Sequence, residues 1–440
     1  MAVIEPRVLK GFRDFLPPAE IERRDLIERF EASFRSYGFV PIDTPALEYA
    51  EILLGKGGGE TEKQIYRFKD HGGRDVALRF DLTVPFARFL AEHREEIILP
   101  FKRYHIAKVW RGENAQRGRY REFTQCDFDI IGSDTAAADF EILLMMRNTL
   151  AAAGAGEVTI RLNHRGLFNR FLEIQGIGGS SAAILRTVDK LAKLGAGEVL
   201  KLLAELIGPE KARGVLDFIR PRDSFEETLK AMIRAAGGES PGAERLRLLC
   251  RFMGDTGTEV SFVLDPSITR GLDYYTGVVF ETFLVRLPEI GSVCSGGRYD
   301  DLAGLYSKEK LSGVGSSIGL DRLIAARESL GAAGTRGSYA PLAVACLREE
   351  DGGLYQALAD RFRGADIACE VFPDPRKLTQ QFILAEKKGA RWVVIPPDTS
   401  GGTAAPVRET KGGLTLRDLV RRENRENLSA REIIDIIKNR

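Results

Sequence analysis

The chain has 440 residues, of which 44% are hydrophobic and 29% are charged, and its formal net charge is +1. This composition is that of an ordinary globular protein, long enough for two or three domains with large cores. A near-neutral balance predicts no general affinity for nucleic acid, so such binding would need a local basic patch. No apolar run approaches the roughly 18–20 residues of a membrane span, and the N-terminus lacks the apolar region of a secretory signal.

The placement of the cysteines and histidines argues against a disulfide-stabilised protein and against a zinc site. The five cysteines are scattered without C-x-x-C spacing, and none of the four histidines lies at metal-ligand spacing. This pattern predicts reduced thiols in a cytoplasmic protein and no protein-bound metal site.

The first predicted element is a helix over residues 19–37, where apolar residues such as Phe30 and Phe34 recur on one stripe. Prolines precede it and Gly38 follows it, as is usual at helix ends. Residues 39–48 then have the composition of a strand, whose two prolines predict a sheet edge or an interface.

The middle of the chain changes character twice. Residues 76–132 are mostly strand-like, with a helix near 83–93, whereas 165–258 are alanine-rich and helical. Strand character returns at 259–299, and a helix begins near Leu320. Strands that are interrupted by a helical block and then resume predict an antiparallel sheet carrying an inserted helical domain.

The last hundred residues form a different pattern. Residues 331–340 are glycine-rich and weakly periodic, which predicts a linker after a core of residues 1–330. Strands and helices alternate over 341–440, which indicates a small α/β domain with a largely parallel core. The expected fold class is therefore α+β, with the helical insertion at 165–258.

Residues 104–132 are expected to form two strands around a short loop. Side chains alternate between the faces of a strand. One face of the second strand is largely apolar and can pack against a core. The other would carry Arg119, Arg121, Phe123, Gln125, Asp127 and Asp129. A solvated sheet with a polar outer face is the simplest interpretation.

Three features of that face favour a ligand site instead. Phe123 sits in its middle, its carboxylates lie at the far end, and its cations lie at the loop end, where Arg111 adds a third. Such a face suits a ligand with phosphate at one end and an amine or imidazole at the other. Arginine is planar and permanently charged, and is the natural partner of phosphate.

Similar residues recur elsewhere. Arg79, Asp81 and Thr83 would share one face of an extended segment, and "TRGLDYYTG" at 269–277 places polar residues between two predicted strands. Glycines in "CSGGRYDDL" and "GVGSSIGLDRL" would allow the backbone to approach a ligand closely. The last run matches neither the Walker A pattern nor G-x-G-x-x-G.

Taken together, these segments resemble the class II aminoacyl-tRNA synthetases, and within them the histidyl-tRNA synthetase family. "FRSYGFVPIDTPALE", "VWRGENAQRGRYREF" and "GVGSSIGLDRL" are similar to motifs 1, 2 and 3, and "TRGLDYYTGVVFE" and "CSGGRYDDL" to the two histidine-specific motifs. The five segments follow the family's order and cover nearly the whole chain. The resemblance implies a class II antiparallel sheet flanked by helices, a homodimer built on motif 1, and an anticodon-binding α/β domain at 341–440.

The resemblance also implies an activity. L-Histidine would be activated by ATP, with Mg²⁺, to histidyl-adenylate and pyrophosphate, and then transferred to the 3′-end of tRNA(His). The alternatives are a non-catalytic, histidine-sensing regulatory paralogue of ATP phosphoribosyltransferase and an RNA-binding module. The regulatory paralogue typically lacks the anticodon-binding domain and has a degraded arginine motif. This chain has both the C-terminal domain and the arginine motif "TRGLDYYTG", which favours the enzyme.

The family's residue roles carry over onto matching positions. The histidine-binding residues would be Asp81, Thr83, Gln125, Asp129, Tyr274, Tyr275 and Tyr299. The ATP-binding residues would be Arg111, Glu113, Arg119, Phe123, Arg270 and Arg322, of which Arg111 and Arg270 would be catalytic at the α-phosphate. Candidates for contact with the tRNA acceptor end are Gln116 and Arg117, for which an exposed polar loop is the alternative.

The last domain contains candidates for a local basic patch. They are Arg376, Lys377, Lys387, Lys388 and Arg391. Ordinary solvated helix charges are the alternative for each of them.

Overall fold

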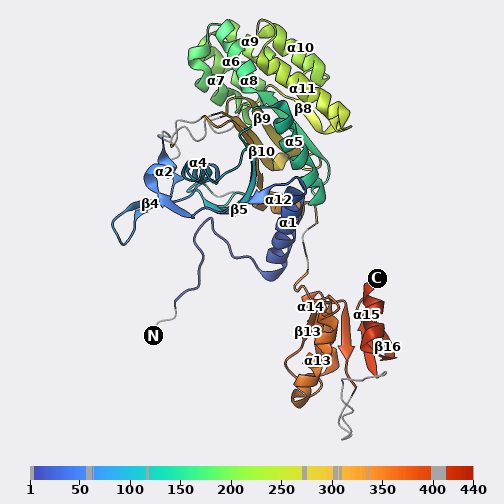
Figure 1. Ribbon diagram of the computed structural model, residues 1–440. Coiled ribbons are helices and arrows are strands. Elements are labelled where there is room, and N and C mark those ends of the chain that lie inside the picture. The colour runs from blue at the N-terminus through green and yellow to red at the C-terminus, as the bar shows by residue number, and fades with distance from the viewer. Residues whose placement is uncertain are drawn as a thin grey trace. The chain divides into compact units, whose positions relative to one another are not determined.

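The computed structural model describes residues 4–439 apart from 56–61, 63, 115–117, 270–274, 301–305, 307–309, 333, 335 and 398–412. The chain divides into two compact units (Figure 1). The larger unit comprises Met1–Arg13 and Leu26–Ala332, and the smaller comprises Asp14–Asp25 and Ala333–Arg440. Each unit has a hydrophobic core of its own.

An eight-stranded sheet forms the centre of the larger unit, in the order β1-β5-β6-β11-β10-β9-β7-β8. The six central strands are antiparallel, as predicted, but β1 is parallel to β5 and β8 is parallel to β7. Parallel neighbours need a long crossover, and a block of helices connects β7 to β8. The strands are β1 Val40–Pro41, β5 Phe101–Trp110, β6 Glu122–Ile131, β7 Val158–His164, β8 Phe262–Leu264, β9 Val278–Leu284, β10 Cys294–Tyr299 and β11 Gly313–Gly319.

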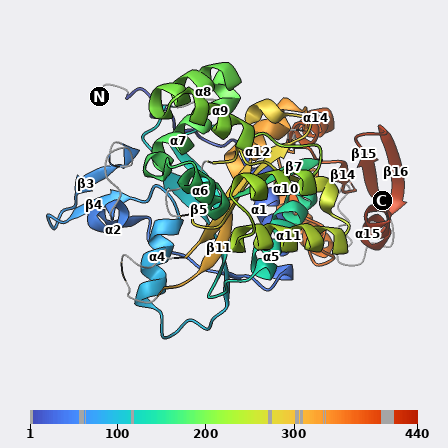
Figure 2. The same cartoon turned by 90° about the horizontal axis from the view of Figure 1, so that it is seen from above.

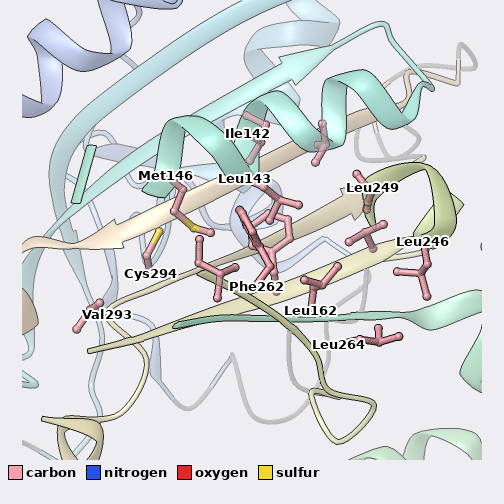
Figure 3. Packing of buried hydrophobic residues seen from close by; sticks show 14 of the residues in the cluster. Ile142, Leu143, Met146, Leu162, Leu246, Leu249, Phe262, Leu264, Val293 and Cys294 are labelled. Carbon is pink, nitrogen blue, oxygen red and sulfur yellow. The ribbon is translucent and has the colours of Figure 1, made fainter. Parts of the chain in front are cut away.

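The apolar face of this sheet is covered by helices. Figure 3 shows side chains of α5 lying over residues of β7, β8 and β10. The predicted first helix is confirmed, because Phe30 and Phe34 are fully buried and the Phe34 ring lies 5.0 Å from that of Phe128. Thr135 begins α5 by accepting a hydrogen bond from the Ala138 amide. The covering helices are α1 Pro17–Ser36, α5 Ala136–Ala152 and α12 Leu320–Ser329.

Six helices follow β7 in the chain, and they form a bundle beside the sheet (Figure 1). Ser224 and Ser240 cap two of them through their side chains, and the Phe171 and Phe218 rings stack with centroids 4.2 Å apart. The bundle returns the chain to β8, beside β7. The helices are α6 Arg165–Ile174, α7 Ser181–Val188, α8 Leu191–Ile207, α9 Pro209–Phe218, α10 Phe225–Ala235 and α11 Pro241–Asp255.

A three-stranded sheet of order β2-β4-β3 lies with α2 beside α4 at one flank of the larger unit (Figure 2). Two strand predictions fail here. The strand expected at 39–48 is split between β1 and β2, which belong to different sheets, and two prolines lie between Val40 and Leu47. Thr83 begins α4, which confirms the helix expected near 83–93 but contradicts the alternating face expected over Arg79, Asp81 and Thr83. The elements are β2 Leu47–Tyr49, α2 Ala50–Leu54, β3 Arg67–Lys69, β4 Asp75–Leu78 and α4 Thr83–Glu92.

The smaller unit contains a five-stranded sheet of order β13-β12-β14-β15-β16. Its first three strands are parallel, as the alternation predicts, whereas β15 and β16 are antiparallel. Ser429 and Glu432 form a capping box at the last helix. The elements are β12 Leu342–Val344, α13 Gly352–Arg363, β13 Cys369–Val371, α14 Leu378–Lys388, β14 Trp392–Ile395, β15 Leu414–Asp418, β16 Glu423–Leu428 and α15 Ala430–Lys438.

Across the described parts of both units, none of the helices has the length and apolar character that crossing a membrane requires.

Candidate active site

The register of the large sheet brings polar side chains from neighbouring strands together. Arg103 on β5 lies opposite Asp129 on β6, and Gly315 on β11 lies opposite Asp129 from the other side. One step along, Asp127 lies opposite Ser317. Because directly opposite residues point to the same face, these positions form one polar surface on the side of the sheet away from the apolar core.

Glycines allow the groups on this surface to lie close together. A Cβ atom on Gly315 would come within 1.8 Å of an Asp129 carboxylate oxygen. One on Gly313 would come within 2.4 Å of the Tyr299 ring, and one on Gly297 within 2.8 Å of the Tyr275 ring. A side chain at any of these positions would displace its neighbour. The glycines of β10 and β11 therefore leave the space that the Asp129 carboxylate and the two tyrosine rings occupy.

A buried carboxylate anchors one end of the surface. Asp129 accepts a hydrogen bond of 2.6 Å from the Tyr299 hydroxyl and pairs with Arg103 at 2.5 Å. The Arg103 guanidinium also lies 3.8 Å from the centre of the Phe86 ring. Burial raises the pKa of Asp129, while Arg103 and the Tyr299 hydroxyl act in the opposite direction.

Two further carboxylates lie near Asp129. Burial raises the pKa of Asp81 to about 6 against the opposing charges of Arg111 and Arg103. It raises the pKa of Asp127 to about 7, where Arg103 opposes the shift and the charge of Asp129 adds to it. Three buried carboxylates around one arginine therefore form an acidic cluster that attracts a cation.

The acidic cluster contains two polar atoms with unused bonding capacity. One oxygen of Asp81 accepts a hydrogen bond from the Val84 amide at 3.1 Å. Within the part of the chain that the structure describes, its other oxygen, Oδ2, has no hydrogen-bond partner, and neither does the side-chain oxygen of Gln125. Buried acceptors normally have partners, so these two are suited to a donor from a ligand, such as an ammonium group.

A cavity of about 250 Å³ opens next to Gln125. Among its lining residues, Gln125 donates a hydrogen bond of 3.1 Å to Ser317, and the Arg111 guanidinium lies 5.2 Å from the centre of the Phe123 ring. The Arg111 side chain also donates to the Phe80 carbonyl at 2.8 Å. All the described residues that the sequence assigns to ATP line this cavity: Arg111, Glu113, Arg119, Phe123 and Arg322.

Other predicted histidine-binding residues lie nearer the acidic cluster. Tyr275 and Tyr299 belong to one small apolar cluster with Phe86. Thr83, the first residue of α4, is half-buried and lies two residues after Asp81. Four predicted residues lie outside the described parts of the chain, namely Arg270, Tyr274, Gln116 and Arg117.

Two arginines predicted on polar strand faces instead donate hydrogen bonds to backbone carbonyl groups. Arg79 follows the end of β4, is buried, and donates to the carbonyls of Lys108 and Thr44. Arg121 precedes β6 and donates to the carbonyls of Glu113 and Lys10. The predicted alternation fails for both because neither residue lies within a strand.

Two features near the site were not predicted from the sequence: Arg103 and a contact from the N-terminal segment. Arg13 pairs with Asp321 at 2.5 Å and lies 4.0 Å from the centre of the Tyr120 ring. Asp321 in turn accepts from the Thr124 amide at 2.8 Å. Strand alternation places Arg103 beside the carboxylates once β5 and β6 are paired in register, whereas no local pattern connects Arg13 with Asp321.

An antiparallel sheet that carries arginines around a cavity and a cluster of buried carboxylates is the arrangement expected of a class II aminoacyl-tRNA synthetase. The family model described as histidyl-tRNA synthetase matches residues 11–323. The chain therefore belongs to the histidyl-tRNA synthetase family.

Individual relatives agree. The chain is 56% identical to histidine–tRNA ligase of Treponema denticola, over 89% of this chain and 88% of the relative. It is 50% identical to that of Treponema pallidum, over 98% and 97% of the two chains. The crystal structure of histidyl-tRNA synthetase from Nostoc superposes with a TM-score of 0.88 at 31% identity, covering 99% of this chain and 100% of the other.

Proposed function

We propose that this chain is a histidine–tRNA ligase. The histidine carboxylate attacks the α-phosphorus of ATP, a new P–O bond forms, and pyrophosphate leaves with the electrons of the broken bond. The 3′-terminal ribose hydroxyl of tRNA(His) then attacks the carbonyl carbon of the adenylate, AMP leaves, and the hydroxyl proton is released. The chain's part is mainly positioning and charge stabilisation.

The observation that carries the proposal is the pair of buried acceptors on Asp81 and Gln125. Together with Thr83 they bind the α-amino group of histidine. Asp129 and Tyr275 bind the two imidazole nitrogens, while Tyr299 and Tyr274 line the pocket. An analogue lacking either nitrogen leaves a buried polar group unpaired, and such sites discriminate by about 10⁴–10⁵.

The cavity beside Gln125 receives ATP in this proposal. Phe123 and Arg322 sandwich the adenine, Glu113 faces its edge, and Arg119 reaches the γ-phosphate. Arg111 and Arg270 stabilise the charge that develops at the α-phosphate.

Magnesium enters with ATP. The described residues contain no cluster of three or more potential metal ligands. In this proposal the ion would be held mainly by the phosphates of ATP, because Mg²⁺ commonly binds through substrate phosphates with few protein ligands. When bound, Mg²⁺ neutralises phosphate charge as the α-phosphorus is attacked.

The tRNA is assigned to three regions. Gln116 and Arg117 contact the acceptor end, the insertion at 165–258 lies beside it, and residues 341–440, following a linker at 331–340, bind the anticodon. Of the five candidate cations, several have acidic partners: Arg376 pairs with Asp374 at 3.0 Å, and Lys388 pairs with Glu370.

We further propose that the active form is a cytoplasmic homodimer. The edge strand β1 and the small sheet leave four large side chains 40–50% exposed, namely Val40, Leu47, Tyr49 and Phe68. Val40, Leu47 and Tyr49 lie in or directly after the motif 1 segment, and Tyr49 and Phe68 lie on either side of Val76 in the small sheet. Exposed apolar side chains of this kind suit a protein–protein interface. Light scattering should give twice the chain mass. A monomer at micromolar concentration would contradict this part of the proposal.

The deciding experiment is ATP–pyrophosphate exchange. The purified protein should incorporate labelled pyrophosphate into ATP with histidine and with no other amino acid, and it should then charge tRNA(His). Relatives named as ligases that align over nearly the whole chain favour this outcome over a histidine-sensing paralogue. Histidine binding without exchange would point to the regulatory alternative.

Replacing Arg270 tests the catalytic assignment. Arg270→Ala should lower exchange by about 10²–10³-fold without altering the unfolding temperature, because one charged donor to the transition state is lost. Arg286→Ala, an exposed arginine after β9, is the matched control. Wild-type turnover in Arg270→Ala would refute the role.

A further inference from the structure

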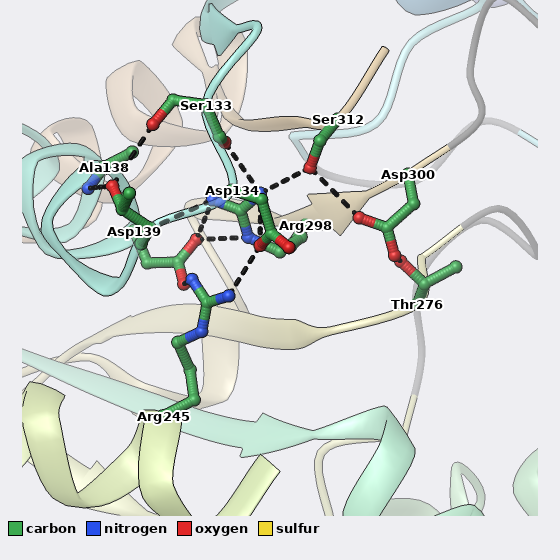
Figure 4. Close-up of polar contacts among 10 residues, drawn as sticks. Ser133, Asp134, Ala138, Asp139, Arg245, Thr276, Arg298, Asp300 and Ser312 are labelled. Carbon is green, nitrogen blue, oxygen red and sulfur yellow. Dashed lines mark hydrogen bonds and ion pairs between the residues drawn. The ribbon is translucent and has the colours of Figure 1, made fainter. Parts of the chain in front are cut away.

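Outside the cavity, a network of ion pairs and hydrogen bonds is built around two buried charged residues (Figure 4). At its centre Arg298 of β10, 3% exposed, binds Asp139 of α5, which is fully buried, at 2.7 Å. Arg298 also donates to the Ser133 carbonyl at 3.0 Å and to the Ser312 hydroxyl at 2.8 Å. None of these groups is assigned a contact with histidine or ATP.

The network reaches the helical insertion on one side. Arg245 of α11 donates to the second Asp139 oxygen at 3.1 Å and pairs with Asp134 at 2.5 Å. Figure 4 shows Arg245 pointing from its helix toward the Asp139 carboxylate. Two arginines from elements far apart in sequence therefore share one buried carboxylate, which makes their positions interdependent.

On the other side the network ends next to the pocket tyrosines. Ser312 donates to Asp300 at 3.1 Å, and the Thr276 hydroxyl donates to the other Asp300 oxygen at 2.5 Å. Thr276 directly follows Tyr275, and Asp300 directly follows Tyr299. The Thr276 amide also donates to the Arg298 carbonyl at 2.9 Å.

The insertion holds the same region by a second route. Arg165, the first residue of α6, donates its amide to the Gly277 carbonyl at 2.8 Å. Its side chain donates to the Thr269 carbonyl at 3.2 Å. One residue of the insertion thus binds both boundaries of the 269–277 segment, while Arg298 and Asp139 join Arg245 to Thr276.

We propose that Arg245, Asp139 and Arg298 form a positioning network through which the helical insertion sets the placement of Tyr275 and Tyr299, and hence the affinity of the site for histidine. This inference rests on the proposed histidine site. None of the three residues lines the cavity, so the network acts through the Thr276–Asp300 contact. Its effect should fall on histidine and spare ATP.

The first test replaces Arg245. Arg245→Met should raise the KM for histidine in pyrophosphate exchange by about 3–30-fold, the range of coupling between residues in one network, and change the KM for ATP less than about twofold. Arg245→Lys, which keeps the charge, should restore part of the loss. Arg247→Met is the matched control, because Arg247 lies on the same helix and pairs with Glu239 at 2.7 Å.

A double-mutant cycle tests whether the two ends communicate. Thr276→Val removes the hydroxyl that donates to Asp300. If the network is continuous, the fold-increase in KM of the double variant with Arg245→Met should be smaller than the product of the fold-increases of the two single variants. Independent, multiplicative effects would overturn the inference, as would equal effects of Arg245→Met and Arg247→Met.

Amide hydrogen exchange separates this inference from the proposed function. In the full-length protein without substrates, Arg245→Met should speed exchange at the Thr276 amide by at least about threefold, while core amides of β7 keep wild-type protection. Unchanged protection at Thr276 would overturn the network whatever the enzyme's activity. Absence of histidine-dependent pyrophosphate exchange in the wild-type protein would instead overturn the proposed function.

Discussion

At the scale of single residues, the acidic cluster combines three buried carboxylates with one buried arginine. Water would solvate isolated carboxylates far better than this pocket does, so each holds its proton more tightly than usual. The cluster is therefore poised to accept a cationic group. Both predictions at this scale follow from the raised pKa values of these carboxyl groups.

The first concerns the pH dependence of histidine use. With the pKa of Asp81 at about 6, its carboxyl loses its charge as the pH falls from 7.5 to 5, and its attraction for the α-amino group is lost. The KM for histidine should therefore rise over this window. Asp81→Asn should raise the KM at pH 7.5 by about 10–100-fold, the equivalent of one hydrogen bond to a charged group.

The Asp81→Asn variant is also the control for the substrate, whose own imidazole titrates at about 6.5. The variant keeps the substrate's pH dependence and loses that of the carboxyl. Identical pH profiles of KM for the variant and the wild-type protein would contradict the assignment of Asp81.

The second prediction concerns stability. Asp127 has its pKa raised to about 7 in the folded protein, against about 3.9 when unfolded. Between these values the folded state binds a proton that the unfolded state has released, so the free energy of unfolding falls as the pH rises. Asp127→Asn lacks this loss and should therefore gain stability relative to the wild-type protein between pH 5 and pH 8.

Urea unfolding of the larger unit at pH 5 and at pH 8 measures the stability of Asp127→Asn relative to the wild-type protein. Asp255→Asn, at the exposed end of α11, should shift the midpoint equally at both. A gain by Asp127→Asn that is no greater at pH 8 than at pH 5 would contradict the buried-carboxylate argument.

At the scale of elements, β10 and β11 show why glycine-rich strands serve this site. Gly315 lies opposite Asp129, and its missing side chain leaves room for the carboxylate. Gly297 gives room to the Tyr275 ring in the same way. Glycine normally weakens a strand, so these two strands are locally less stable. The same glycines allow the carboxylate and the tyrosine ring to lie close to the backbone at the site.

Gly315→Ala tests this element. The added methyl would displace the Asp129 carboxylate, so the KM for histidine should rise by at least about 100-fold, as expected when a buried charge loses its partners. ATP binding, measured directly, should persist. Gly214→Ala, on α9 with open space around it, should be neutral or stabilise the helix. A wild-type KM in Gly315→Ala would contradict the packing argument.

Much of this element-scale picture could be predicted from the sequence. The alternation that begins at Phe123 predicts the faces of β6, because a buried strand must separate polar from apolar residues. The alternation wrongly places Arg79 and Arg121 on strand faces, because a short pattern does not show where a strand ends and both residues lie just outside one. Arg13 and Asp321 could not be paired, since only the folded sheet brings residues so distant in sequence together.

At the scale of the whole molecule, two units have separate hydrophobic cores. Among the residues that the structure describes, neither the acidic cluster nor the cavity lining includes any from the smaller unit. Adenylate formation should therefore depend on the larger unit alone, whereas transfer to tRNA should need both.

A chain ending at residue 340 tests this division. It should keep histidine-dependent pyrophosphate exchange within about threefold, as expected for domains that fold independently, and lose most tRNA charging. Val393→Asp, which disrupts the core of the smaller unit at a fully buried site, should behave alike in the full-length chain. Loss of exchange in both proteins would show that the units are energetically dependent.

The strand order has a consequence for biosynthesis. Gln125 and Ser317 touch across neighbouring strands but are 192 positions apart in the chain. During translation, β6 must wait with one edge open until β11 has been made, and contacts between such distant segments form slowly. The substrate pocket is therefore completed late in folding. Until then the nascent chain exposes an unpaired edge, which makes this interval the one most vulnerable to aggregation.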